Sequence, residues 1–290
     1  MIKLRAIACF IMAIGFFACD EVGPNIDFGP PPAFDTTFIT TPVPTAQNRV
    51  VLVEEFSGVQ CSNCPNGAAE VEEIIADNPG RIAAVTLHAG FFAVPYSDST
   101  EDFEIEETIE INDWLAIPAY PSAVFDRFQF EGTPVAPILA TDLWPVRVGE
   151  RLNVPTIVNI STGASIETVD DNSFIRAGTT VIFTESFEEN AFLAVYLTED
   201  DIVDLQLMPD NTINELYKHK HVARDMFTPW NGALLTNNSG YEAGTTFIKD
   251  FDLDIDPNWD LDNLYIVALV FKNNENSKEV LQSATEKLTL

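Results

Sequence analysis

Two cysteines, Cys61 and Cys64, form a Cys-x-x-Cys pair within the stretch EEFSGVQCSNCPNGAAEVEEI, residues 54–74. The pair stands where a strand-like apolar run gives way to a helical pattern. A helix N-terminus supplies partial positive charge and free N–H groups, which favour a thiolate on the first cysteine. This position suits thiol–disulfide exchange, with Cys61 attacking and Cys64 resolving. The same pair could instead hold a metal or close a structural loop.

The first nineteen residues predict an export signal. Lys3 and Arg5 precede an apolar run from Ala6 to Ala18, which is shorter than the roughly 20 residues needed to cross a bilayer. Ala18-Cys19 resembles the lipobox of bacterial lipoproteins, in which the cysteine carries lipid and becomes the new N-terminus. We expect lipidation of Cys19, because only lipidation gives that cysteine a role. The alternative is ordinary cleavage after Gly15, which leaves an unpaired thiol.

The remaining cysteines and histidines are too few for a structural zinc site. Cys9 leaves with the export signal and Cys19 carries lipid, so the folded body retains only Cys61 and Cys64. A thiolate zinc site needs about four ligands. The only candidate helpers are three histidines: His88, His219 and His221. We therefore expect no metal and no cofactor, and we interpret the pair as a dithiol or disulfide outside the cytoplasm.

The same histidines and a run of aspartates offer weaker metal hypotheses. His219 and His221 would share one face of a strand, where Asp225 could join them, but polar packing or a surface position is preferred. His88 could lie near the cysteines, or it could be a capping or core residue. Four aspartates share one strand face: Asp250, Asp252, Asp254 and Asp256. They lack the EF-hand spacing, so a solvated face is preferred over calcium binding.

The composition narrows the class of protein. With 290 residues, of which 46% are hydrophobic, the chain is long enough for two globular domains. Forty-five acidic residues against fifteen basic ones give a formal charge of −30, which argues against nucleic acid or an anionic membrane face as partner. Neither a Ser-His-Asp order, a P-loop nor a dinucleotide glycine pattern stands out, so hydrolase and nucleotide-dependent functions have no support.

Four segments follow one another along the chain. After the signal, residues 20–48 hold six prolines and predict an extended tether, although residues 36–41 could add a strand to the body. Residues 49–153 begin with VVLVEEF, a helix after the cysteines, and RIAAVTLHAG, which together predict a βαβ unit with parallel strands. A partly helical acidic segment, a strand in IPAYPSAVFDRF and a closing helix from Leu139 to Leu152 follow.

The last segment, residues 154–290, has a different sequence pattern. Seven short β-branched or aromatic runs are separated by Asn, Gly, Asp or Pro turns: PTIVNISTGASIE, SFIRAGTTVIFTESF, AFLAVYLTEDDIV, ELYKHKHVARDMF, GTTFIKDFDLDI, NLYIVALVFKN and EVLQSATEKL. This pattern predicts an all-β, antiparallel, immunoglobulin-like sandwich without a long helix.

The order of motifs around the pair resembles the α/β thioredoxin-like fold. In that family a cis-proline faces the cysteines and the residue before it offers backbone groups to a substrate strand, which implies these roles for Pro121 and Tyr120. Glu55 matches the buried carboxylate that helps the resolving cysteine lose its proton. Ser62-Asn63 and Pro65 depart from the family pattern.

A resemblance to a narrower family covers nearly the whole exported chain. The lipoprotein signal, EEFSGVQCSNCPNGA, AYPSAVFDR, HKHVARDM and WDLDNLYIVALVF are similar to the Omp-twenty-eight-related outer-membrane lipoproteins of Bacteroidota. This resemblance implies a thioredoxin-like domain followed by a β-sandwich. It also implies that an N-terminal lipid holds the protein at the cell envelope, in the outer membrane. It implies little about activity.

Two functions remain open from the sequence. The first is thiol–disulfide exchange with exported or envelope proteins, which would make the protein an oxidoreductase. The second is a non-catalytic surface-binding or assembly lipoprotein with a structural disulfide. Acidic neighbours disfavour a thiolate and support the second function, since no basic residue lies between Arg49 and Arg81.

Overall fold

The computed structural model describes residues 33–133, 136–236 and 240–290. The predicted signal peptide, the lipid attachment at Cys19 and the first part of the tether lie outside these residues. Within them, strands predominate and no helix is long and apolar enough to cross a membrane.

A βαβ unit forms the start of the body, as the apolar runs predict. Strand β2 (Val51–Ser57), helix α1 (Cys64–Asp77) and strand β3 (Ile82–His88) follow in order, and β2 pairs with β3 in parallel from Val51↔Ile82 to Ser57↔His88. Every residue of both strands is buried. Such continuous burial explains why their sequences are apolar runs rather than alternating patterns.

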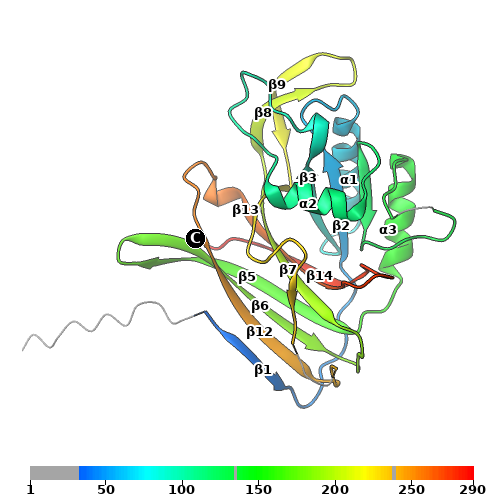
Figure 1. Cartoon of the computed structure of the whole chain (residues 1–290), viewed down its shortest axis with the longest axis vertical. Helices are drawn as coiled ribbons and strands as arrows, with labels where there is room; N and C mark the ends of the chain where they lie inside the picture. Colours follow the sequence, from blue (N-terminus) through cyan, green and yellow to red (C-terminus); the bar gives the residue numbers. More distant parts are fainter. Residues whose placement is uncertain (1–32, 134–135, 237–239) are drawn as a thin grey trace, which may run out of the picture.

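The rest of this half covers the two faces of the strands. Short helix η1 (Gly90–Phe92) and helix α2 (Glu106–Leu115) precede β4 (Ser122–Phe125), which pairs with β2 antiparallel. Helices η2 (Thr141–Leu143) and α3 (Trp144–Leu152) close the segment, with Pro145 in the first turn, where its missing N–H costs no hydrogen bond. Helices α1 and α3 contact each other on one face, whereas α2 packs on the other (Figure 1).

Two sheets face each other, with most of their strands from the second half of the chain. The first has the order β1-β12-β6-β5. Its strands are β1 (Asp35–Ile39), β5 (Val158–Val169), β6 (Asn172–Phe183) and β12 (Thr245–Asp254). Strand β1 pairs with β12 antiparallel, so part of the predicted tether does add a strand to the body.

The second sheet has the order β14-β13-β7-β10-β3-β2-β4, with β11 beside β7. Its later strands are β7 (Ala191–Glu199), β10 (Val222–Met226), β11 (Ala233–Leu234), β13 (Leu264–Lys272), which follows the short helix η3 (Leu261–Asn263), and β14 (Val280–Lys287). One apolar core fills the space between the sheets, with side chains from β5, β6 and β12 meeting those from β7 and β13. The structure confirms the predicted sandwich-like sheets, but one of them also includes β3, β2 and β4, which the sequence prediction assigned to a separate domain.

One sheet runs through both halves of the chain. Strand β10 pairs with β7 antiparallel and with β3 in parallel at Val222↔Thr86, where the Thr86 N–H donates to the His221 carbonyl over 2.7 Å. The strands before and after residue 153 are therefore hydrogen-bonded neighbours.

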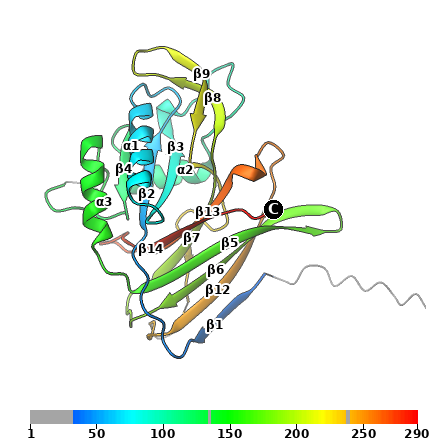
Figure 2. The same cartoon turned by 180° about the vertical axis from the view of Figure 1, so that it is seen from behind.

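A two-stranded hairpin lies outside both sheets. Strands β8 (Ile202–Leu207) and β9 (Ile213–His219) pair only with each other, and the hairpin lies beside α1 and β3, at the end of the molecule opposite β1 (Figures 1 and 2). The sequence prediction that these residues belong to the sandwich is wrong. Most of β9 is exposed, so it has no apolar face to bury between two sheets.

Candidate functional site

Cys61 and Cys64 form a disulfide with an S–S distance of 2.11 Å. Cys64 is the first residue of α1, and Cys61 lies in the preceding turn, where its carbonyl accepts a hydrogen bond from the Cys64 N–H at 3.2 Å. The first helical turn contains no acidic residue, but it contains Pro65, which removes one N–H donor. The dipole of α1 therefore acts on the sulfurs, but this helix N-terminus has one free backbone N–H donor fewer than a helix without proline there.

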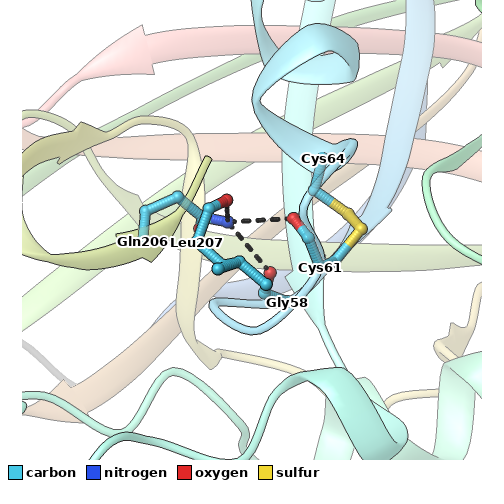
Figure 3. Close-up of a disulfide and its surroundings, with 5 residues drawn as sticks. All are labelled: Gly58, Cys61, Cys64, Gln206 and Leu207. Carbon is cyan, nitrogen blue, oxygen red and sulfur yellow. Dashed lines mark hydrogen bonds between the residues drawn. A yellow bond between two sulfur atoms is a disulfide. The ribbon is translucent and has the colours of Figure 1, made fainter. Parts of the chain in front are cut away.

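The β8–β9 hairpin covers the disulfide. The Gln206 side chain donates to the carbonyls of Cys61 at 3.1 Å and Gly58 at 3.4 Å (Figure 3). The Leu207 N–H donates to the Val59 carbonyl at 2.8 Å. Cys61 is 3% exposed and Cys64 is 1% exposed. Both cysteines are therefore buried, so a polypeptide cannot reach either sulfur without a local opening of the structure.

Ion pairs join α1 to the base of the hairpin, which consists of Asp200 before β8 and of Lys220 and His221 after β9. His221 Nε2 lies 2.8 Å from Glu72 Oε1, its Nδ1 lies 3.2 Å from Asp200 Oδ1, and Lys220 also pairs with Glu72. Burial acts to lower the pKa of His221, but the hydrogen bonds to Asp200 and Glu72 outweigh it and raise this pKa to about 9. The hydrogen bond from His221 lowers the pKa of Glu72 to about 2. Both groups are therefore charged at neutral pH.

The placement of His221 corrects one prediction. Strand β9 ends at His219, and His221 adopts a positive φ of 54° in the turn before β10, so the two histidines do not share a strand face. Asp225 lies further along, in β10. No group of three or more His, Cys, Asp or Glu side chains in the described residues could hold a metal ion.

On the other side of the cysteines, the loop before them packs against residues 90–94. The Gln60 N–H donates to the Phe92 carbonyl at 2.9 Å, and the Gln60 side chain donates to the Val94 carbonyl at 2.7 Å. A Cβ at Gly58 would lie 2.4 Å from the Phe92 carbonyl oxygen, so this close approach requires glycine.

Glu55 is a buried carboxyl with one unsatisfied oxygen. Its Oε2 accepts a hydrogen bond from Thr86 Oγ1 at 3.4 Å, while its Oε1 has no partner. Burial raises the pKa of Glu55 to about 8, against smaller opposing effects of His221 and Thr86. The carboxyl can therefore hold or release a proton near neutral pH.

Pro121 lies against the same part of α1 as Glu55. A Cβ at Gly67 would lie 2.8 Å from Glu55 Oε1 and 3.0 Å from the Pro121 Cβ, so the two side chains meet one helical turn after Cys64. The Tyr120–Pro121 peptide bond is cis. The Tyr120 hydroxyl donates to Asn112 Oδ1 at 2.5 Å, and burial raises its pKa to about 12. The fold thus gathers Cys64, Glu55 and Pro121 around one turn of α1, with Tyr120 beside them in the chain.

A cavity of about 440 Å³ lies between α1 and the hairpin. Cys64, Glu55, His88 and His219 are among its lining residues. The rings of His88 and His219 are 5.6 Å apart, and burial lowers the pKa of both. His88 therefore does lie in the region of the cysteines, as one of the sequence hypotheses allowed.

The sequence did not predict that the β8–β9 hairpin packs beside the cysteines. Gln206, Leu207 and Glu72 carry no motif that marks them as neighbours of the cysteines, because the hairpin meets α1 only through tertiary packing. The aspartates of β12 lie outside this site and have partners on neighbouring parts of their own sheet. Asp252 forms an ion pair with Arg176, and Asp250 accepts a hydrogen bond from the Phe34 N–H.

Three solved structures are similar to this chain, and the first two share its overall fold. HBP35 of Porphyromonas gingivalis is 16% identical, and the match covers 83% of this chain and 76% of that one with a TM-score of 0.65. A protein from Agrobacterium tumefaciens is 13% identical, with 84% and 99% of the two chains covered and a TM-score of 0.50. A domain of the outer membrane lipoprotein Omp28 from P. gingivalis is 18% identical over 46% of this chain and 89% of its own, with a TM-score of 0.30.

The sequence comparison identifies the family. No curated protein matches the chain. The model of the family described as outer membrane protein Omp28 matches residues 112–289, from α2 to the end of the last strand, which is more than half of the chain. The chain therefore belongs to the Omp28 family of outer membrane proteins and is a protein of the cell envelope.

Proposed function

We propose that this protein carries out thiol–disulfide exchange on exported or envelope proteins, through a thioredoxin-like region that contains Cys61 and Cys64. The observation that carries the proposal is Glu55, a buried carboxyl with an unpaired oxygen that lines the same cavity as Cys64. An unpaired buried carboxyl costs stability, so a disulfide with a purely structural role gives no reason to keep one there.

The arrangement supports a two-step exchange. In the reducing direction, the Cys61 thiolate attacks a substrate disulfide, one substrate sulfur leaves as a thiolate, and a mixed disulfide forms. Cys64 then gives its proton to Glu55 and attacks the Cys61 sulfur, which releases the second substrate thiolate and restores the Cys61–Cys64 disulfide. The two electrons pass from the cysteine pair to the substrate. Oxidation of a substrate dithiol follows the same steps in reverse.

Exchange with a polypeptide also requires the hairpin to open. The bonds from Gln206 and Leu207 to the loop at residues 58–61 and the ion pairs of His221 must break together. Tyr120 and Pro121 then form the edge that we assign to substrate docking. Lipid at Cys19 would keep this chemistry at the membrane surface.

Insulin reduction by the full chain in mild detergent, with dithiothreitol as electron source, tests the proposal. Cys61→Ser should abolish activity, and Glu55→Gln should lower it at pH 8.5, where the Glu55 carboxyl is mostly ionised and can accept the Cys64 proton. Glu73→Gln is the matched control, since Glu73 lies exposed on α1. Activity that is unchanged in Cys61→Ser would refute the proposal.

A second function is favoured by the cover over the disulfide. With both cysteines buried and Gln206 bonded to the loop, the disulfide could serve only to stabilise the end of the molecule in a binding or assembly protein. The reduction potential of the pair separates the two functions. A value below about −300 mV marks a structural disulfide, whereas a value between about −270 and −120 mV lies in the range of exchange proteins.

A further inference from the structure

The cavity beside the disulfide has an inner end whose polar atoms are not satisfied by the protein. Three buried lining side chains each carry one atom without a hydrogen-bond partner: Glu55 Oε1, His88 Nδ1 and His219 Nε2. Buried polar atoms in proteins are nearly always paired, so three of them around one cavity indicate a bound group.

The other walls of the cavity are mostly apolar. The apolar part comes from side chains of α1 and the hairpin: Pro65, Ala68, Ala69, Val71, Met208 and Pro209. Polar residues lie between them and toward the mouth: Ser57, Asn66, Glu72, Thr86, Gln206, Lys218, Lys220 and His221. Water alone suits such a space poorly, because each ordered water needs two to four polar partners. A molecule with an apolar body and one polar head matches it better, and about 440 Å³ is within the range of small-molecule sites.

The charges around the cavity favour a cationic head. Glu55 forms no ion pair with any residue that the structure describes. The three cations that line the cavity are already paired: His221 with Glu72 and Asp200, Lys220 with Glu72, and Lys218 with Asp201 at 3.6 Å. Neutral imidazoles accept N–H hydrogen bonds, and the Tyr217 ring in the wall offers a face to a cation. The formal charge of −30 also concentrates small cations near the protein.

We propose that this cavity binds a small organic cation, with an ammonium or amidinium head against Glu55, His88 and His219 and a compact apolar body between α1 and the hairpin. The proposal concerns the oxidised protein with its disulfide intact. It does not depend on exchange activity.

Binding should depend on pH through Glu55. The groups that face this carboxyl are Thr86 from β3, Glu72 from α1, and Tyr217 and His221 from the hairpin side. Glu72, with a pKa near 2, Tyr217, with a pKa near 12, and His221, with a pKa near 9, keep their charge states between pH 6 and 8. A cation selects the ionised form of Glu55 and displaces its proton, so the affinity should rise about tenfold per pH unit below pH 8.

Calorimetric titration of the oxidised full chain in mild detergent with benzylamine, and with benzyl alcohol as its neutral counterpart, tests the site. Benzylamine should bind at least tenfold more tightly than benzyl alcohol at pH 7.5, and about tenfold more tightly at pH 7.5 than at pH 6.5. Glu55→Gln should remove both differences. Ala68→Phe should abolish binding by filling the cavity, and Glu73→Gln should leave it unchanged.

Three outcomes overturn the proposal. They are no binding of benzylamine, equal binding of the amine and the alcohol, and amine binding that survives Ala68→Phe, which would place the amine elsewhere on the acidic surface. Circular dichroism and an intact disulfide verify that each variant is folded. If Glu55→Gln does not fold, the amine–alcohol comparison and Ala68→Phe decide the question. Because no turnover is measured, failure here is separate from failure of the exchange hypothesis.

Discussion

The sandwich core and the space between α1 and the hairpin flank the same sheet but are built differently. In the sandwich, Phe183 stacks on Tyr241 with ring centroids 4.3 Å apart, and the Tyr241 hydroxyl is bonded to the Leu235 carbonyl and the Ala191 N–H. Beside α1, buried Glu55 and His88 have unpaired atoms and border a cavity. The first region gains stability from close packing, whereas the second gives up stability because buried polar groups are left unpaired beside a cavity.

The largest expected effect comes from the packed region. Phe183→Ala should reduce the free energy of unfolding by about 3–5 kcal/mol, because it leaves a cavity beside Tyr241, Phe187 and Phe247. Urea denaturation measures the change. Phe91→Ala, at a side chain that is 79% exposed, is the control and should change stability by less than about 0.5 kcal/mol. Similar losses in the two variants would show that the sandwich core is not closely packed.

In the α1 region, removing a charge should stabilise the protein. The raised pKa of Glu55 means that the folded state binds a proton more tightly than the unfolded state, so wild-type stability falls as pH rises from about 4.5 to about 8. The fall is about 1.4 kcal/mol per pH unit. Glu55→Gln should remove it and be more stable than wild type at pH 8, by an amount on the order of 4 kcal/mol. Thermal unfolding at pH 5 and pH 8 checks this, and a variant less stable at both values contradicts it.

The disulfide should contribute less than the packed core. Replacing Cys61 and Cys64 together by serine opens a very short loop, so the expected loss is about 2 kcal/mol on the chain-entropy estimate. Denaturation of the oxidised wild type and the double variant gives the value. A loss as large as that of Phe183→Ala would mean that the disulfide is mainly structural and would weaken the exchange hypothesis.

The smallest effect is expected at the base of the hairpin. Glu72→Gln removes the partially exposed pair with His221, so the cost should be about 1 kcal/mol or less, and the raised pKa of His221 should fall. Hydrogen exchange at the Leu207 N–H should become faster because the hairpin opens more often. Asp201→Asn, which removes only the exposed 3.6 Å pair with Lys218, is the control. Equal exchange rates in the two variants would show that Glu72 does not hold the hairpin closed.

Sequence patterns anticipated the elements of the molecule better than their assembly. The apolar runs gave β2 and β3, and the helical spacing after Cys64 gave α1, because these patterns reflect local burial. The contact of β10 with β3 has no such local pattern, since it is a short strand that pairs across more than a hundred residues. The contact of Gln206 with Cys61 could not be predicted either, because no sequence pattern marks this polar residue and only tertiary packing brings its side chain to the Cys61 carbonyl.

Strand β1 is the first element of the described structure that would bear a force applied at the N-terminus. The chain enters the described structure at β1, on the edge of the sandwich and at the end opposite the hairpin (Figures 1 and 2). Five antiparallel register pairs, from Asp35↔Lys249 to Ile39↔Thr245, join β1 to β12. With lipid on Cys19, tension from the membrane would load these bonds first. Under such a load, strand β1 would separate from β12 before the cysteine pair at the far end is disturbed.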